Sequence, residues 1–133
     1  METIVKSEKK EAKISFEAPF TIIGEKINPT GRKKLAAALK EGNYDYVKQI
    51  ATRQVEIGAD ILDINVGVPG IDEVAVLPEV AKLVSELVDV PLCLDSSGYL
   101  PSILSQGSGS SCFKPKEIFF SSDSMLNTFA STD

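Results

Sequence analysis

The stretch Ala59–Gly67, "ADILDINVG", alternates like a β-strand and carries two polar residues near its end. Successive side chains of a strand point to opposite faces of the sheet. Asp63 and Asn65 therefore share one face with Ile61, and the apolar residues that alternate with them share the other. Because a buried polar group without a partner is costly, the polar face is expected to have a function near the carboxyl end of the strand.

Outward from this stretch, predicted strands alternate with predicted helices. Pro19–Ile27 is a strand followed by turn-forming residues, and Val90–Ser96 is a third strand. Two helices are predicted over Arg32–Gly42, which Gly42 ends, and over Asn43–Gly58, with Asn43 as the N-cap. A third helix has Pro78 in its first turn and an apolar stripe of Leu77, Val80, Ala81, Val84, Leu87 and Val88. Helical connections between consecutive strands indicate an α/β fold with a parallel sheet.

Each predicted strand has a carboxylate or an amide at its carboxyl end. Asp63 and Asn65 end the second strand, Asp95 ends the third, and Glu25 and Asn28 lie at the end of the first. Parallel α/β folds bind ligands outside the carboxyl ends of their strands. Asp95 alone could equally cap a following helix, but three strands that end in this way favour a binding site.

Composition excludes several kinds of chemistry. The 133-residue chain has no histidine, which eliminates Ser-His-Asp and Cys-His nucleophile systems and the usual His-containing metal clusters. Its two cysteines form neither a disulfide framework nor a zinc motif, so no metal site is predicted. A net charge of −5 argues against nucleic acid and anionic membranes as partners. With no apolar segment of membrane-spanning length, a cytoplasmic location is expected.

The composition changes near residue 97. Residues 98–133 are rich in serine and show no strand or helix periodicity. Two explanations are open: a flexible tail, or a truncated or frameshifted chain in which arbitrary residues replace a continuing α/β pattern, and we favour the second. The expected organisation is an N-terminal arm or short edge structure over 1–18, a parallel α/β unit over 19–97, and an irregular or disordered tail over 98–133.

Three motifs carry a family resemblance: "IGEKINPTG" (Ile23–Gly31), "GADILDINVG" (Gly58–Gly67) and "PLCLDSS" (Pro91–Ser97). Together they resemble the first third of the pterin-binding TIM (β/α)₈ barrel of methyltetrahydrofolate:corrinoid methyltransferases and of the folate module of cobalamin-dependent methionine synthase. The resemblance covers about residues 19–97, or about three βα units of a barrel that needs about 250 residues. It is weaker toward dihydropteroate synthase, which has a Gly-Gly-Glu-Ser-Thr type segment where this chain has Asn65–Pro69.

The resemblance implies a function and a set of site residues. It implies that Asp95 accepts hydrogen bonds from the aminopyrimidine edge of a pterin, that Asp63 and Asn65 line the inner end of the pocket, and that Asn28 lies on its rim. The implied reaction moves the methyl group from N5 of methyltetrahydrofolate to a corrinoid (cobalamin) held by a partner protein or domain, in an enzyme that is commonly a homodimer. The catalytic residues are expected on later strands, so this chain alone is expected to be inactive. The alternatives are a dihydropteroate synthase-like enzyme and a non-catalytic pterin-binding fragment.

Overall fold

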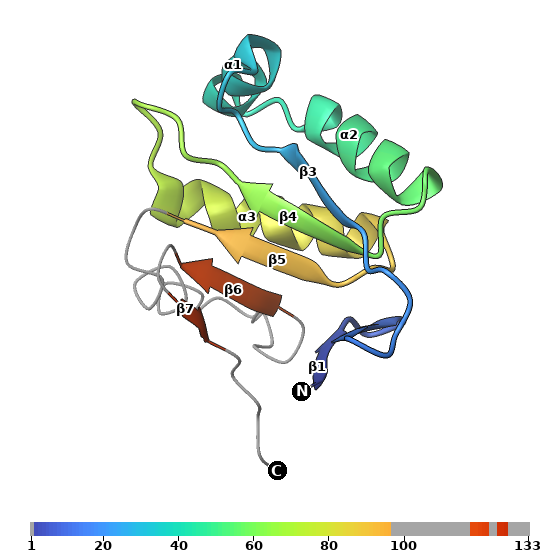
Figure 1. Ribbon diagram of the computed structural model, residues 1–133. Coiled ribbons are helices and arrows are strands. Elements are labelled where there is room, and N and C mark those ends of the chain that lie inside the picture. The colour runs from blue at the N-terminus through green and yellow to red at the C-terminus, as the bar shows by residue number, and fades with distance from the viewer. Residues whose placement is uncertain (1, 97–117, 123–124, 128–133) are drawn as a thin grey trace.

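The computed structural model describes residues 2–96, 118–122 and 125–127 and shows a mixed α/β chain (Figure 1). Its elements are β1 (Glu2–Lys6), β2 (Glu11–Ser15), β3 (Ile23–Ile27), α1 (Lys33–Glu41), α2 (Asp45–Glu56), β4 (Ile61–Asn65), α3 (Glu73–Leu87), β5 (Leu92–Asp95), β6 (Ile118–Ser122) and β7 (Met125–Asn127). The strands form a two-stranded sheet, β1-β2, and a five-stranded sheet in the order β3-β4-β5-β6-β7.

The larger sheet is parallel from β3 to β6, and only β7 runs antiparallel to its neighbour. The three predicted strands are therefore adjacent and parallel, as expected from their helical connections. Leu62, Ile64 and Leu94 are buried and pack against apolar residues of the helices, which places the helices on one face of this sheet. The opposite face of β4 and β5 carries the polar residues.

Helices α1 and α2 are joined by a tight turn. Gly42 ends α1 in the left-handed conformation, with φ of 67°, and its N–H bonds carbonyls of the last turn. The prediction of Asn43 as the N-cap of α2 is wrong by one residue, since Tyr44 holds that position. The Asn43 side chain still accepts a hydrogen bond from Asp45 N at 3.2 Å, because an Asx turn satisfies the first free N–H just as a cap does.

Helix α3 begins earlier than its apolar stripe suggests. Asp72 is its N-cap and accepts a hydrogen bond from Val74 N at 3.1 Å. Pro78 consequently lies in the second turn rather than the predicted first turn. The buried residues are Leu77, Val80, Ala81 and Val84. Leu87, which was predicted in the stripe, is 46% exposed because it ends the helix.

The first residues form an ordered hairpin. Strands β1 and β2 pair in antiparallel fashion, and Val5 and Ala12 pack against Ile61 at the start of β4. The hairpin turn is tied to the segment before β5: the Ser7 hydroxyl donates to the Asp89 carbonyl. The hairpin therefore covers the end of the sheet at which β4 and β5 begin (Figure 1).

Strand β3 contains an irregularity that is held by a buried glutamine of α2. Gly24 pairs with Leu62 and Ile27 with Ile64, so β3 has one more residue than β4 between these pairs. The N–H of Lys26, within this bulge, donates to Gln54 Oε1 at 2.8 Å. Gln54 is 3% exposed, and a Cβ on Gly24 would lie 2.7 Å from the same oxygen. Glycine at 24 is thus required for the approach of Gln54.

Two strands lie in the segment that was expected to be irregular. β6 pairs in parallel with β5, and β7 pairs in antiparallel fashion with β6. The prediction of irregular structure is therefore wrong for these two elements. A physical reason is that the edge of β5 offers unpaired backbone groups that an extended segment can satisfy. The rest of the predicted tail lies outside the described residues.

Candidate functional site

The candidate site lies on the face of β4 and β5 that points away from the helices. In the parallel register, Asp63 is opposite Cys93 and Asn65 is opposite Asp95. All four side chains are half-buried, whereas their alternating neighbours Leu62, Ile64, Leu92 and Leu94 are buried in the helix-covered core. The facing predicted from strand alternation is confirmed, and the site is at the carboxyl end of both strands.

A chain of two hydrogen bonds joins the ends of these strands. Asn65 Nδ2 donates to Asp95 Oδ2 at 3.0 Å, and Gly67 N donates to Asn65 Oδ1 at 2.8 Å. The bond to the aspartate is charge-assisted when that carboxylate is ionised, which makes it stronger than a bond between neutral groups. The structure therefore brings together two of the predicted site residues through a direct contact.

Asp63 lies two residues before Asn65 on the same face of β4, and the pKa of its carboxyl group is raised. Burial raises the pKa of Asp63 above its usual value, and the nearby negative charges of Asp95 and Glu25 raise this pKa further. A hydrogen bond from the Cys93 side chain acts in the opposite direction on the pKa. Asp63 therefore retains its proton to higher pH than an exposed aspartate and can then act as a hydrogen-bond donor.

Asn28, the fourth predicted site residue, lies in the loop after β3. Its Oδ1 accepts a hydrogen bond from Thr30 N at 3.0 Å, which is the geometry of an Asx turn. No described hydrogen bond connects Asn28 with Asp63, Asn65 or Asp95. The local turn gives Asn28 a structural role, and a position on the rim of a pocket stays a prediction.

Two residues outside the predicted set, Cys93 and Glu25, also act on this site. Cys93 is half-buried, packs against the apolar cluster of Val5, Ala12 and Ile61, and forms a hydrogen bond with the Asp63 side chain. Glu25 was noted only as a strand-end carboxylate, and its charge acts on Asp63. The signal for Cys93 was available in the strand parity, which puts it on the same face as Asp95.

The arrangement is suited to ligands that donate hydrogen bonds. The carboxyl groups of Asp95 and Glu25 both lie within electrostatic reach of Asp63. Among the described residues, no group of histidine, cysteine, aspartate and glutamate side chains has the arrangement of a metal site. An uncharged or cationic group with N–H donors fits such a site better than an anion does.

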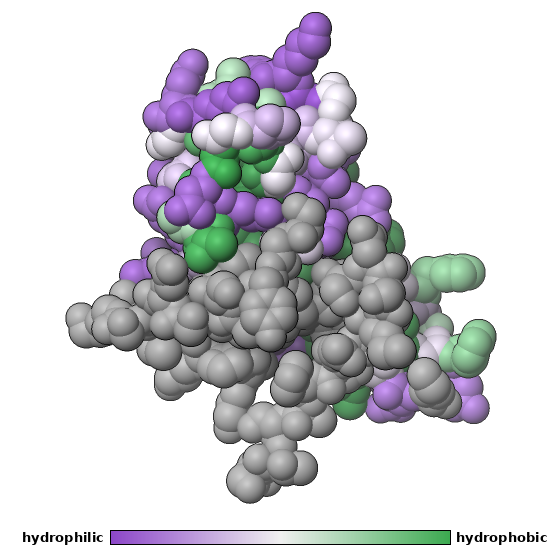
Figure 2. All heavy atoms as spheres, turned by 90° about the vertical axis from the view of Figure 1, so that its left-hand side faces the viewer, coloured by the Kyte–Doolittle hydropathy of each residue, from purple (hydrophilic) through white to green (hydrophobic). Residues whose placement is uncertain are grey.

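Figure 2 views the molecule from the side toward which β4 and β5 run, and the upper part of this face is mostly hydrophilic, with a few apolar side chains between. Within the described part of the chain, no helix is long and apolar enough to cross a membrane. No known protein-family model matches the chain.

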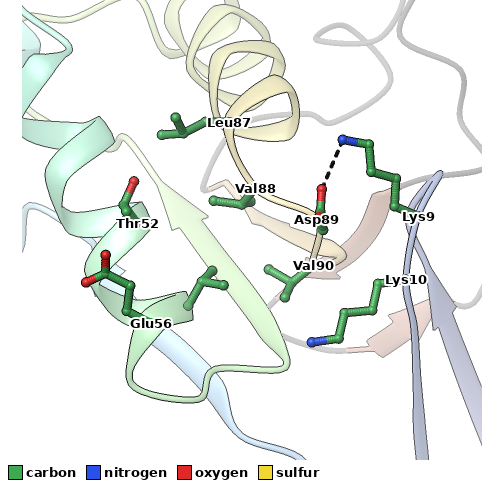
Figure 3. Close-up of a pocket in the computed structure, with 9 residues that line it drawn as sticks. Lys9, Lys10, Thr52, Glu56, Leu87, Val88, Asp89 and Val90 are labelled. Carbon is green, nitrogen blue, oxygen red and sulfur yellow. Dashed lines mark ion pairs between the residues drawn. The ribbon is translucent and has the colours of Figure 1, made fainter.

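A cavity of about 550 Å³ lies between the hairpin turn and the carboxyl ends of α2 and α3 (Figure 3). Val55, Val88 and Val90 line it, and at its hairpin side Lys9 Nζ lies 3.1 Å from Asp89 Oδ1. Asp89 lies three residues before the start of β5, so this cavity is at the opposite end of the sheet from Asp95. Its exposed ion pair helps to hold the hairpin in place but adds little stability.

Proposed function

We propose that the Asp63/Asn65/Asp95 site binds the aminopyrimidine ring of a reduced pterin. We further propose that the chain forms the first part of a (β/α)₈ barrel of a methyltetrahydrofolate-dependent methyltransferase. The parallel strands, the helices on one face and the polar residues at the carboxyl strand ends support this proposal, since barrel enzymes place their ligands there. The three motifs that resemble this family contain the same residues.

The observation that carries the proposal is the way Asp95 is held. Asn65 donates one hydrogen bond to Oδ2 of the carboxylate, and we assign Oδ1 and the second lone pair of Oδ2 to the ligand. A carboxylate can accept two parallel N–H groups, and an aminopyrimidine edge offers an amino group beside a ring N–H. Asp63, protonated to higher pH than usual, would add a donor for a ring nitrogen or a carbonyl oxygen of the same ligand.

The proposed parent reaction is transfer of the N5 methyl group to a corrinoid held by a partner protein or domain. The departing N5 is a poor leaving group unless it gains a proton or a strong hydrogen bond as the C–N bond breaks. The residues of this chain would bind and orient the pterin for that step. The groups that assist N5 are expected on strands beyond β5, so the chain alone should not catalyse the transfer.

Isothermal titration calorimetry with methyltetrahydrofolate tests the proposal. The wild-type chain should bind, and Asp95→Asn should bind about 10- to 100-fold more weakly, as expected for loss of a hydrogen bond to a charged group. Asp45→Asn is the matched control, because Asp45 is exposed at the start of α2 and should leave affinity unchanged. Absence of binding by folded wild-type protein would refute the proposed site.

A second measurement tests whether this chain binds the pterin without being able to catalyse the methyl transfer. Wild-type protein, methyltetrahydrofolate and a reduced corrinoid are mixed, and formation of methyl-corrinoid is followed by its absorbance spectrum. No transfer above the protein-free rate is expected. Transfer that depends on the chain would show that its own residues suffice for catalysis and would overturn the expectation that later strands supply these groups.

A further inference from the structure

Asn65 has two hydrogen-bond partners that fix the orientation of its amide. The oxygen faces Gly67 N at 2.8 Å and the nitrogen faces Asp95 Oδ2 at 3.0 Å. With the amide turned over, Nδ2 would face another N–H donor, and Oδ1 would face a carboxylate oxygen. Both contacts would become repulsive, so the two partners specify the same orientation.

We propose that Asn65 is a positioning residue that orients the Asp95 carboxylate, and that the Gly67 N–H in turn orients Asn65. This inference rests on the proposed function and changes the role of one predicted ligand contact. Asn65 would act on the ligand through Asp95: by holding Oδ2 it directs Oδ1 toward the open side of the site. The affinity for the ligand then depends on a backbone N–H in the loop after β4.

The two hydrogen bonds from Gly67 N to Asn65 and from Asn65 to Asp95 are called the relay below, and the backbone geometry makes them possible. Asn65 and Asp95 are directly opposite in the β4–β5 register, which brings their side chains side by side on one face. Gly67 leaves space for the amide, since a Cβ there would lie 3.1 Å from Asn65 Oδ1. A side chain at 67 would therefore push against the amide without removing any hydrogen-bonding group.

Two other asparagines provide internal controls. Asn43 Oδ1 accepts from Asp45 N and Asn28 Oδ1 accepts from Thr30 N, so each repeats the i to i+2 bond of Asn65. Neither Nδ2 donates to a carboxylate in the described hydrogen bonds. The difference between Asn65 and these two residues isolates the contact with Asp95.

The first test needs no ligand. Exchange of the side-chain NH₂ hydrogens with water is measured by NMR for the three asparagines in the free protein. The Asn65 hydrogens should exchange about tenfold more slowly than those of Asn43 and Asn28, as expected for one added hydrogen bond. Asp95→Ala should remove this difference. Equal exchange of all three in the wild-type protein would overturn the inference.

The second test uses methyltetrahydrofolate as the probe. Asn65→Ala should weaken binding about tenfold, the effect of one lost hydrogen bond. Gly67→Ala should weaken it less, because it displaces the Asn65 amide without removing a hydrogen-bonding group, and Asn43→Ala should not weaken it. Asn65→Ala should cause no further loss when Asp95 is already alanine, because its effect passes through that carboxylate. Equal losses in both backgrounds would overturn the inference.

The two tests separate the inference from the proposed function. Slow, Asp95-dependent exchange together with no pterin binding would support the relay and refute the pterin site. Pterin binding that persists in Asn65→Ala, together with fast Asn65 exchange, would refute the relay and leave the pterin site standing. The exchange measurement on wild-type protein does not depend on whether any variant folds.

Discussion

Gly24→Ala is expected to destabilise the chain strongly although the backbone can accept alanine. Gly24 is not among the glycines with positive φ, so the effect is steric. The new Cβ would lie 2.7 Å from Gln54 Oε1 and 2.9 Å from Leu62 Cδ2, both closer than side-chain contacts allow. Gln54 is buried and would have to leave its bond with Lys26 N.

The magnitude follows from three contributions. Overpacking of a core costs about 1–3 kcal/mol, and a buried N–H left without its acceptor costs about 1–3 kcal/mol. The lower entropy of an unfolded chain with alanine offsets about 0.4–1 kcal/mol. The net expectation is a loss of about 2–4 kcal/mol, which with a typical urea dependence of about 1–3 kcal/mol/M lowers the unfolding midpoint by about 1–2 M.

Urea unfolding followed by circular dichroism measures this loss, and a double-mutant cycle with Gln54→Ala tests its cause. In the Gln54→Ala background, Gly24→Ala should cost less, since the closest contact has gone and Leu62 can shift. If Gly24→Ala costs less than about 0.5 kcal/mol, within the range of a neutral surface change, or costs the same in both backgrounds, the steric reasoning is refuted.

Three further changes test other parts of the structure. Asp63 has a folded pKa raised above the 3.8 of the exposed group, so its favourable contribution is complete below pH 3.8 and is lost as pH rises through the folded pKa. Asp63→Asn should therefore be more stable than wild type at pH 7 and lose this advantage near pH 3.8 in paired urea titrations; a constant difference would contradict the raised pKa. Asp72→Ala should lower the free energy of unfolding by about 1 kcal/mol through loss of the α3 cap, and Asp72→Asn should retain most of it; equal losses would argue against capping. Val5→Ala should cost about 1–2 kcal/mol by removing two buried methyl groups at about 0.8 kcal/mol each, whereas Thr3→Ala should cost little; a cost for Val5→Ala below about 0.5 kcal/mol, the range of a surface change, would mean that the hairpin is not packed on β4.

Much of the fold could be predicted from local sequence pattern. Strand alternation correctly separated Asp63 and Asn65 from the apolar face of β4, and the order of strands and helices correctly indicated a parallel sheet. These features depend on residue spacing within one element, which the sequence shows directly. The first residues of α2 and α3 were predicted less accurately. Each helix begins where a nearby side chain can accept a hydrogen bond from its first free N–H groups, and residue spacing alone does not show that position.

Contacts between elements could not be predicted in the same way. The hydrogen bond between Asn65 and Asp95 depends on the relative register of β4 and β5, and a shift by one residue would have placed Asn65 opposite Leu94 or Ser96. The burial of Gln54 depends on the bulge in β3, which has no clear signal beyond Gly24. The pairing of β6 with β5 likewise depends on a long-range contact that lacks local periodicity.

The face of β4 that points away from the helices is apolar at the start of the strand and polar at its carboxyl end. This difference explains the chemistry of the site. Ile61 is covered by Val5 and Ala12 of the hairpin, so the face is apolar where β4 begins. Asp63 is the next residue on this face. It forms a hydrogen bond with Cys93, which packs against the same apolar cluster, and burial raises the pKa of Asp63. Asn65, at the carboxyl end, satisfies its amide with Gly67 and Asp95. The hairpin thus closes one end of the face, where burial raises the pKa of Asp63, whereas Asp95 lies at the carboxyl end and is held by the hydrogen bond from Asn65.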